Sequence, residues 1–354
     1  MRALSIVFSA LLLVTSGPTR ADAPLDAGQR RGAVEGLARA LRALYVFPDV
    51  GERTATTLEQ KLARGQYTQA QAEAFAAALN QDLQTHTKDR HFRVRFDPAY
   101  HGPSDPDADW SPDQKARFRQ MAARQNFGVA RVELLPGNVG LIDLRSFPPT
   151  EFSAATLTAA MTLVASTDAL ILDLRQNGGG DPETIAFLCS YFFPQGSKVH
   201  LNDIYNRPKN TTEEFWTLSV PGPRYLARPV YVLTSARTFS GAEEFSYDLQ
   251  TQKRATLIGE TTGGGANPGG PMPIGAGFVA FIPTGRAINP ITKTNWEGTG
   301  VKPDVATSAP AALKLAHAQA VRTILKAETD AERRKSLERA LAMIEKGRSE
   351  PEPR

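Results

Sequence analysis

The sequence predicts an α/β fold of the mixed α+β kind, in which a small helical region precedes a larger region of alternating strands and helices. Apolar residues recur at helical spacing over residues 27–84. From residue 138 onward, short apolar runs of strand length alternate with stretches of helical pattern. The chain has 354 residues, 41% of them hydrophobic, enough for two structural units or one large domain with a buried core.

The first half contains helices, one strand and a long connection. Residues 65–68 separate two of the helices, and Thr68 precedes Gln71 by the spacing of a capping box. Residues 91–96, HFRVRF, alternate apolar and polar side chains and predict a strand. The segment 98–112 is rich in Pro and Asp and predicts a loop or a lid.

The second half supplies most of the predicted strands. They are expected at residues 138–144, 169–175, 229–235, 255–260 and 277–283. Helices are expected at 154–165, 182–193, 241–252 and 311–326, and the charged segment 331–354 predicts a surface helix with a frayed tail. These elements divide the chain into a helical domain at 25–90, an α/β domain at 91–310 and a helical tail at 311–354.

Residues 1–21 have the pattern of a secretory signal peptide. A short basic region with Arg2 precedes an apolar stretch at 3–14, and small residues at Thr19 and Ala21 predict cleavage after Ala21. A membrane anchor is the alternative, but the stretch is short for a span and no later apolar run reaches about 20 residues. The expected product is exported to the periplasm or the outside, without stable membrane insertion.

Charge and composition exclude several classes of protein. There are 41 Lys and Arg against 37 Asp and Glu, a formal net charge of +4, and loss of Arg2 and Arg20 with the leader lowers it to +2. This is too little for a nucleic-acid-binding surface. The single cysteine, Cys189, excludes disulfide frameworks and thiolate-rich metal clusters, and its apolar neighbours indicate a core position.

Motifs for cofactors and catalytic metals are missing too. The glycine-rich segment 259–270 has neither the ending of a P-loop nor the spacing of a dinucleotide site, and a specificity loop beside an active site is the favoured interpretation. The sequence has no HExxH or comparable cluster. We therefore expect neither a cofactor nor a metal.

The first of two notable strand–turn–helix junctions is DLRQNGGGDPE, residues 173–183. Its three glycines allow a ligand to approach the backbone closely, and Asp181-Pro182 has the pattern of a helix start. Backbone amides at such a start can stabilise an anion. The alternative is a tight turn that needs positive φ angles.

The second junction places Ser240 at the start of a helix. Ser240 with Glu243 has the spacing of a capping box, so a helix cap is one interpretation. In the other, Ser240 is a nucleophile, and the Gly241 amide with a glycine amide from the first junction stabilises an oxyanion.

A serine nucleophile needs a base, and the chain has five histidines. His91 is the candidate because it begins a strand directly after a charged turn. We expect no catalytic role for the others, which are His86, His101, His200 and His317. The carboxylate that orients the base must come from elsewhere in the chain, because a triad is defined by geometry.

Four motifs occur in an order that resembles one family. DLRQNGGG, FSGAEE, IGETTGGG and WEGTGVKPDV are similar to motifs of the C-terminal processing (tail-specific) serine proteases. The resemblance is greatest to the branch containing tricorn core protease and interphotoreceptor retinoid-binding protein, and it spans about residues 28–306. It implies a small N-terminal helical domain followed by a catalytic domain of the ClpP/crotonase-like type.

The resemblance also implies a site. Ser240 would be the nucleophile, and Gly179 with Gly241 would supply the oxyanion-hole amides. The tricorn-like arrangement of a histidine and a glutamate implies a triad of Ser240, His91 and Glu297.

Three departures from the family pattern stand out. Tail-specific members have a lysine 25 positions after the serine, where this chain has Gly265, so the serine–lysine dyad is absent. Arg90 stands where tricorn has a serine that assists the base. The chain between His91 and Asn138 is too short for the PDZ domain common in the family, and the loop 98–123 is expected to gate access instead.

The leading hypothesis is an exported serine endopeptidase that hydrolyses polypeptides through an acyl-enzyme without a cofactor. A non-proteolytic carrier of apolar ligands such as retinoids or fatty acids is the alternative on the same fold. A hydrolase of small esters or amides would share the same machinery. The three catalytic side chains, present together with the glycine loop, favour an enzyme.

Overall fold

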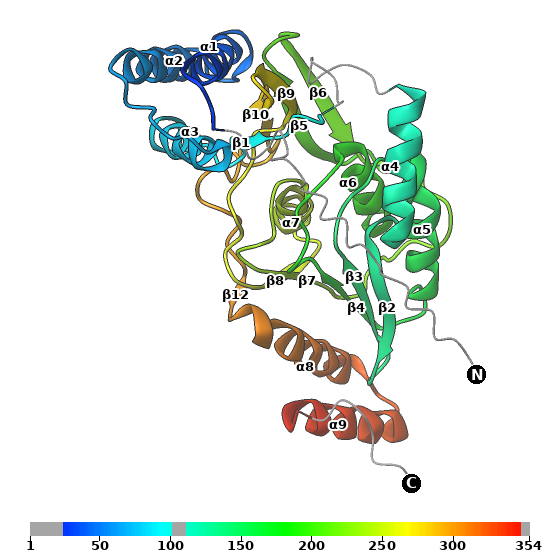
Figure 1. Cartoon of the computed structure of the whole chain (residues 1–354). Helices are drawn as coiled ribbons and strands as arrows, with labels where there is room; N and C mark the ends of the chain where they lie inside the picture. Colours follow the sequence, from blue (N-terminus) through cyan, green and yellow to red (C-terminus); the bar gives the residue numbers. More distant parts are fainter. Residues whose placement is uncertain (1–23, 101–110, 348–354) are drawn as a thin grey trace, which may run out of the picture.

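The computed structural model describes residues 24–100 and 111–347. In Figure 1 the N-terminal helices lie at one end of the molecule and the C-terminal helices at the other. The described chain is a mixed α/β protein, as the sequence predicts. The leader at 1–21 and His101 lie outside the described residues.

The N-terminal helices pack on a three-stranded sheet. They are α1 (Ala27–Leu44), α2 (Pro48–Ala63) and α3 (Ala72–Thr87), and the antiparallel sheet has the order β1 (Arg93–Phe96), β10 (Phe278–Pro283), β9 (Gly269–Gly275). One apolar core joins Leu37 and Phe75 of the helices to Phe278 of the sheet. At Gly36 a Cβ would lie 1.9 Å from the Ile274 carbonyl oxygen, so a glycine is needed where α1 crosses β9. The helical region therefore shares its core with strands from the distal half of the chain.

A six-stranded sheet forms the centre. Its order is β12 (Val305–Ala306), β8 (Thr256–Gly259), β7 (Val230–Thr234), β4 (Ala169–Asp173), β3 (Val139–Leu144), β2 (Val129–Leu135). All neighbours are parallel except β2 with β3. Every residue of β3, β4 and β7 is buried, as expected for parallel strands covered on both faces.

Helices cover both faces of this sheet. One face packs against α5 (Thr150–Leu163), α6 (Pro182–Cys189) and α7 (Gly241–Thr251), the other against α8 (Ala309–Ala327) and, beyond it, α9 (Ala331–Glu345). Cys189 is fully buried in the first of these cores, which confirms the core position predicted for it. A third, antiparallel sheet has the order β11 (Gly285–Ile288), β5 (His200–Asn206), β6 (Thr211–Trp216).

The structure corrects the connection at 98–123. Its last part is a helix, α4 (Pro112–Arg124), followed by the 3₁₀ turn η1 (Asn126–Gly128). Ser111 caps α4 and Gln114 completes a capping box, a helix-start signal that the high content of Pro and Asp obscured. The capping box expected at Thr68 is wrong, because α3 begins at Ala72 with Gln71 as its N-cap and without a side-chain cap.

The predicted strands of the second half lie within two residues of their observed bounds, but other strands escaped prediction. These are β2, β5, β6, β9, β11 and β12. In β6 the exposed side chains include Thr211, Thr212, Glu213 and Glu214, and Phe215 alone is buried. The alternation of apolar and polar residues that predicts a strand is therefore weak there. Such strands form because a neighbouring strand supplies their hydrogen bonds.

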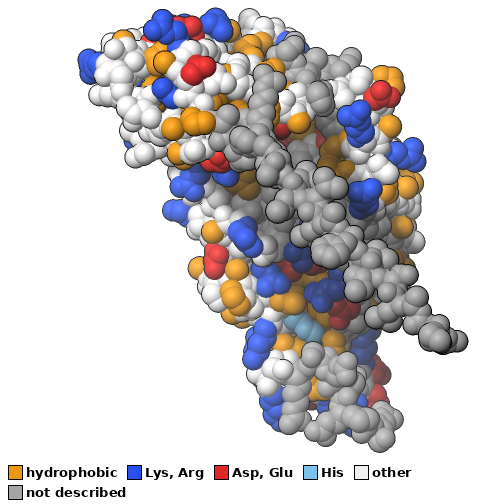
Figure 2. Space-filling model, in the orientation of Figure 1, with side chains coloured by type: hydrophobic (Ala, Val, Ile, Leu, Met, Phe, Trp, Pro, Cys, Tyr) orange, Lys and Arg blue, Asp and Glu red, His pale blue; other side chains and the backbone are white. Residues whose placement is uncertain are grey.

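The surface has a mixed character on the face shown in Figure 2. Lys and Arg side chains are spread along its length, between Asp, Glu and hydrophobic side chains. In the described ranges, no helix combines the length and the apolar character that crossing a membrane requires.

Candidate active site

Ser240 lies in the turn between β7 and α7. As the N-cap of α7 it has φ 53° and ψ −124°, a left-handed conformation that costs a residue with a side chain about 1–3 kcal/mol and often marks a functional site. The carboxylate of Glu243 accepts a hydrogen bond from the Ser240 amide at 2.8 Å. Ser240 Oγ lies 3.0 Å from His91 Nε2, so the turn presents the hydroxyl to an imidazole.

His91 lies between α3 and β1. Lys88, with φ 58°, ends α3 and redirects the chain. The imidazole packs against Phe239 at 4.7 Å between ring centroids and stacks on Phe281 at 5.7 Å. Burial lowers the pKa of His91 to about 4, so the ring is neutral at neutral pH and able to accept a proton. Its buried Nδ1 has no hydrogen-bond partner among the described residues.

Two carboxylates flank His91. Atoms of Asp89, His91 and Glu297 that could bind a metal all lie within 4.8 Å of one another. Glu297 accepts hydrogen bonds from the amides of Ala266 at 2.6 Å and Arg90 at 3.3 Å. Asp89 Oδ1 accepts one from the His91 amide at 3.0 Å. Glu297 is thus close to the ring without a hydrogen bond to it in the described structure.

Both carboxylates have a raised affinity for protons, and Asp89 contributes to that of Glu297. Burial, and then the nearby Asp89, raise the pKa of Glu297 to about 7, and burial raises the pKa of Asp89. Two buried carboxylates this close do not both ionise easily. Together with His91 they also provide donor types that suit a transition-metal ion.

The glycine turn after β4 touches the turn that holds Ser240. A Cβ on Gly179 would lie 2.6 Å from the Gly241 nitrogen and 2.9 Å from Ser240 Cβ, so only glycine fits there. The Gly179 amide donates to Asn177 Oδ1 at 2.8 Å. The amides of Gly180 and Gly241 have no hydrogen-bond partner in the described ranges. The structure therefore brings Gly179 and Gly241 together but engages the Gly179 amide with a side chain.

A cavity of about 370 Å³ adjoins Ser240. Its apolar walls come from Ile204, Phe239, Pro268, Phe281, Ala287 and Trp296. Gly265 also lines it, and a Cβ there would lie 2.3 Å from Phe239 Cζ and 2.7 Å from His91 Cε1. The position of the tail-specific lysine is thus closed to any longer side chain. The segment 259–270 borders this cavity, in the place expected of a specificity loop.

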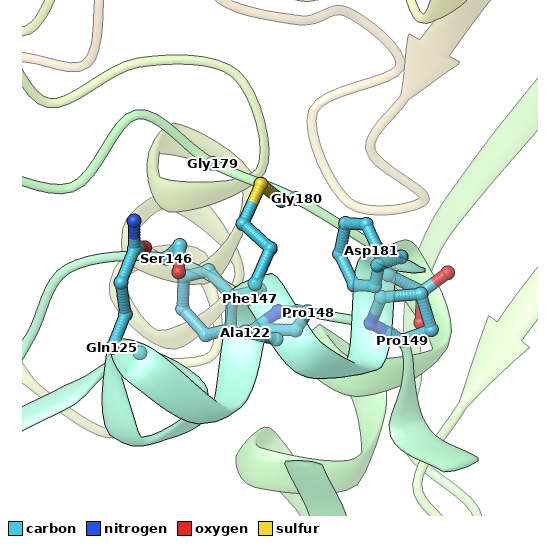
Figure 3. Close-up of a pocket in the computed structure, with 12 residues that line it drawn as sticks. Ala122, Gln125, Ser146, Phe147, Pro148, Pro149, Gly179, Gly180 and Asp181 are labelled. Carbon is cyan, nitrogen blue, oxygen red and sulfur yellow. The ribbon is translucent and has the colours of Figure 1, made fainter. Parts of the chain in front are cut away.

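A second cavity, of about 450 Å³, lies between α4 and the loop that joins β3 to α5 (Figure 3). Gly179 and Gly180 form one wall, and Phe147, Pro148 and Pro149 form another. Because Gly180 lines both cavities, there is room for a ligand on each side of the glycine turn.

Two of the other described histidines have hydrogen-bond partners away from this site. His200 Nε2 lies 2.6 Å from Asp203 Oδ1, and His317 Nε2 lies 2.7 Å from the Pro136 carbonyl oxygen. His86 lies in the last turn of α3.

Sequence reasoning missed three contributors to the site. In the sequence Glu243 has the spacing of a capping box and a place in the motif FSGAEE; in the structure it also accepts hydrogen bonds from Thr262, Gly264 and Gly265. Asn177 positions the glycine turn, with its Nδ2 donating to the Leu144 carbonyl. Asp89 is fully buried, and its carboxylate accepts a hydrogen bond from Asn267 Nδ2 at 2.8 Å. In the sequence, Glu243 and Asn177 are visible only as polar residues inside motifs. Asp89 is visible only as a polar residue two positions before His91.

Two family models match the chain. Residues 138–307 match the model of Peptidase family S41, and residues 28–125 match the N-terminal domain of Peptidase_S41 in eukaryotic IRBP. Together they cover the helical region and the strands of the central sheet other than β2.

Curated relatives are similar over less than half of the chain. The carboxyl-terminal-processing protease of Synechocystis is 28% identical over 154 residues, 43% of this chain and 34% of the relative. The tail-specific protease of Haemophilus influenzae is 28% identical over 155 residues, 42% of this chain and 20% of the relative. The matched region thus spans about a third or less of these two relatives.

Solved structures are similar in fold. A lipoprotein from Streptococcus agalactiae gives a TM-score of 0.53 at 14% identity, covering 85% of this chain and 98% of its own. A putative peptidase from Parabacteroides merdae gives 0.50 at 20% identity, covering 79% and 90%. The tricorn protease gives 0.50 at 13% identity, covering 90% of this chain and 37% of its own.

Proposed function

Because the chain belongs to peptidase family S41, we propose that it is an exported serine endopeptidase that hydrolyses peptide bonds through an acyl-enzyme. The observation that carries the proposal is the 3.0 Å contact between Ser240 Oγ and His91 Nε2, residues 149 positions apart in the sequence. The strained turn at Ser240 and the neutral, buried imidazole supply what a serine nucleophile needs.

In the proposed reaction, His91 Nε2 takes the hydroxyl proton while Ser240 Oγ attacks the carbonyl carbon of the scissile bond. The imidazolium then gives this proton to the leaving amine, and the acyl-enzyme forms. A water molecule attacks the acyl-enzyme with His91 as base again, which releases the second product and restores the serine.

The oxyanion of each tetrahedral intermediate needs two donors. We assign the Gly241 amide, at the start of α7, and an amide of the glycine turn. Gly179 is the position that the family resemblance implies, and its amide would have to exchange Asn177 Oδ1 for the oxyanion.

Glu297 is proposed as the carboxylate of the triad. It lies within 4.8 Å of His91, and the buried Nδ1 lacks a partner among the described residues. When His91 becomes an imidazolium, Nδ1 carries a proton and a carboxylate at this position stabilises the cation. Asp89 supports the same segment from the other side through the His91 amide.

The cavities on the two sides of Gly180 favour a polypeptide substrate over a small ester, because an extended chain would occupy both. Export is proposed from the leader at 1–21, and periplasm or exterior are its two destinations. We propose neither a cofactor nor a metal for the reaction.

The second candidate is a carrier of apolar ligands, which the apolar cavity of Figure 3 favours. A fluorophosphonate probe separates the two functions, since it labels only an activated serine. We expect an adduct on Ser240, located by peptide mass spectrometry, and its loss in His91→Ala. Folded protein that gives no adduct after long exposure would contradict the peptidase proposal and direct the next assay to retinoid or fatty-acid binding.

A further inference from the structure

A carboxylate with one oxygen unpartnered in the described ranges lines the cavity beside Ser240. Glu244 lines the same 370 Å³ cavity as Ser240 and is only 4% exposed. Its Oε1 is buried and receives no hydrogen bond from any described residue. A buried carboxylate oxygen without a donor is costly for the fold, and burial raises the pKa of Glu244 to about 7 against the opposing effect of the Asn202 amide.

No cationic side chain compensates this carboxylate. Among the described residues, neither Lys nor Arg lines the cavity or the one that adjoins it. The adjoining cavity, of about 260 Å³, shares Ile204 and Pro268 with the first and carries the carboxylates of Asp181, Glu183 and Glu213. The nucleophile thus faces a space whose charged groups are all acidic.

The polar environment continues behind Glu244. Asp248 follows it by one turn of α7, is fully buried, and has an Oδ2 without a partner in the described chain. Asn202 on β5 is fully buried with both amide atoms unpartnered. Asn202 lies close enough to Glu244 to lower its pKa, but neither Asn202 nor Asp248 supplies a counter-ion to its charge.

We propose that this cavity binds the basic side chain, lysine or arginine, of the substrate residue whose carbonyl carbon Ser240 attacks, with Glu244 as the anionic group that pairs with it. The inference rests on the proposed peptidase function and names the substrate class for that site. Glu244 lies one helical turn, about 5 Å, beyond the start of α7. The charged end of a substrate lysine or arginine that extends past Ser240 therefore reaches the Glu244 carboxylate.

The walls fit such a side chain. Ile204, Phe281 and Trp296 offer apolar surface to the methylene stem, while the charged end meets the carboxylate, which is how long basic side chains are commonly buried. The arriving cation supplies the donor that Glu244 Oε1 lacks. A substrate without a charge at this end would leave the carboxylate buried and unpaired.

The test compares two diphenyl phosphonate probes of the full-length protein, one derived from lysine and one from norleucine, which has the same stem without the ammonium group. The rate constant for modification of Ser240 is measured by mass spectrometry. We expect the lysine probe to react about tenfold faster or more, the effect of one charge-assisted hydrogen bond. Glu244→Gln should bring the two rates close to each other, whereas Glu338→Gln, an exposed carboxylate on α9, should keep the preference.

Equal rates in the wild type, a preference for norleucine, or a lysine preference that persists in folded Glu244→Gln would each overturn the inference. The wild-type ratio decides the matter even if Glu244→Gln does not fold, which thermal melting would show. The generic fluorophosphonate probe distinguishes the two levels of the proposal. If it labels Ser240 and the lysine preference is missing, only the specificity fails, and if it does not label Ser240, the peptidase function fails.

Discussion

Glu243 and Glu297 both accept hydrogen bonds from amides of the loop 264–266, but they differ in burial and in the number of hydrogen bonds that they accept. Glu243 is fully buried and accepts hydrogen bonds from the Gly264 and Gly265 amides, among others. Glu297 is partly exposed and accepts the next amide, that of Ala266. Each oxygen of Glu243 accepts two hydrogen bonds, which is the arrangement of a structural carboxylate, whereas each oxygen of Glu297 accepts only one. Glu297 lies beside an imidazole whose Nδ1 lacks a partner among the described residues, so its charge remains available to the reaction.

Of the changes to the two glutamates, Glu297→Gln has the larger expected effect, and it acts on catalysis. The amide keeps the size of the side chain but removes the negative charge that stabilises the His91 cation, so kcat should fall about a hundredfold or more. Ser240→Ala should be more severe still and serves as the reference for complete loss. Kinetics on a peptide substrate, with thermal melting to verify folding, measure both. A Glu297→Gln enzyme with wild-type kcat would remove Glu297 from the triad.

Glu243→Gln should act on stability instead. Its carboxylate receives the amides of Ser240, Gly264 and Gly265, and an amide group in its place directs two N–H donors at these N–H groups. We expect the free energy of unfolding to fall by about 2–3 kcal/mol, measured by urea denaturation. Equal stability in Glu243→Gln and the wild type would show that the Glu243 carboxylate does not have the structural role that distinguishes it from Glu297.

The pH profile sharpens the comparison. Since burial and Asp89 raise the pKa of Glu297 to about 7, Glu297 is protonated below this pH and ionised above it. The reaction requires the ionised form, so kcat/KM should rise with pH through an inflection near 7 that disappears in Glu297→Gln. An identical inflection in the variant would assign it to another group.

The smallest expected effect is that of metal removal. Asp89, His91 and Glu297 are close enough to bind an ion, but the proposed mechanism uses the three as base and carboxylates. Dialysis against EDTA should leave the rate unchanged. A loss that added Zn²⁺ or Mn²⁺ restores would contradict the mechanism and make this cluster a metal site.

Much of the fold and part of the site could be predicted because they depend on local pattern. The parallel strands at 139–144, 169–173 and 230–234 appear in the sequence as continuous apolar runs, since both of their faces are buried. Ser240 and the glycine turn follow such strands, and that placement is visible without a structure. The partly polar strand β6 and the capped helix α4 were missed because the hydrophobic pattern is weak in one and turn-forming residues surround the other.

The sequence by itself determined which residues have reactive chemistry: one serine at a strand–helix turn, one histidine after a charged turn, and a run of three glycines. Only the tertiary structure decided what surrounds them. The hydrogen bond from the Arg90 amide to Glu297 joins positions 207 residues apart, and the engagement of the Gly179 amide with Asn177 depends on how one turn packs on another. Periodicity reports which face of a local element is buried, whereas the partner of a buried polar group is fixed by the packing of loops distant in the chain.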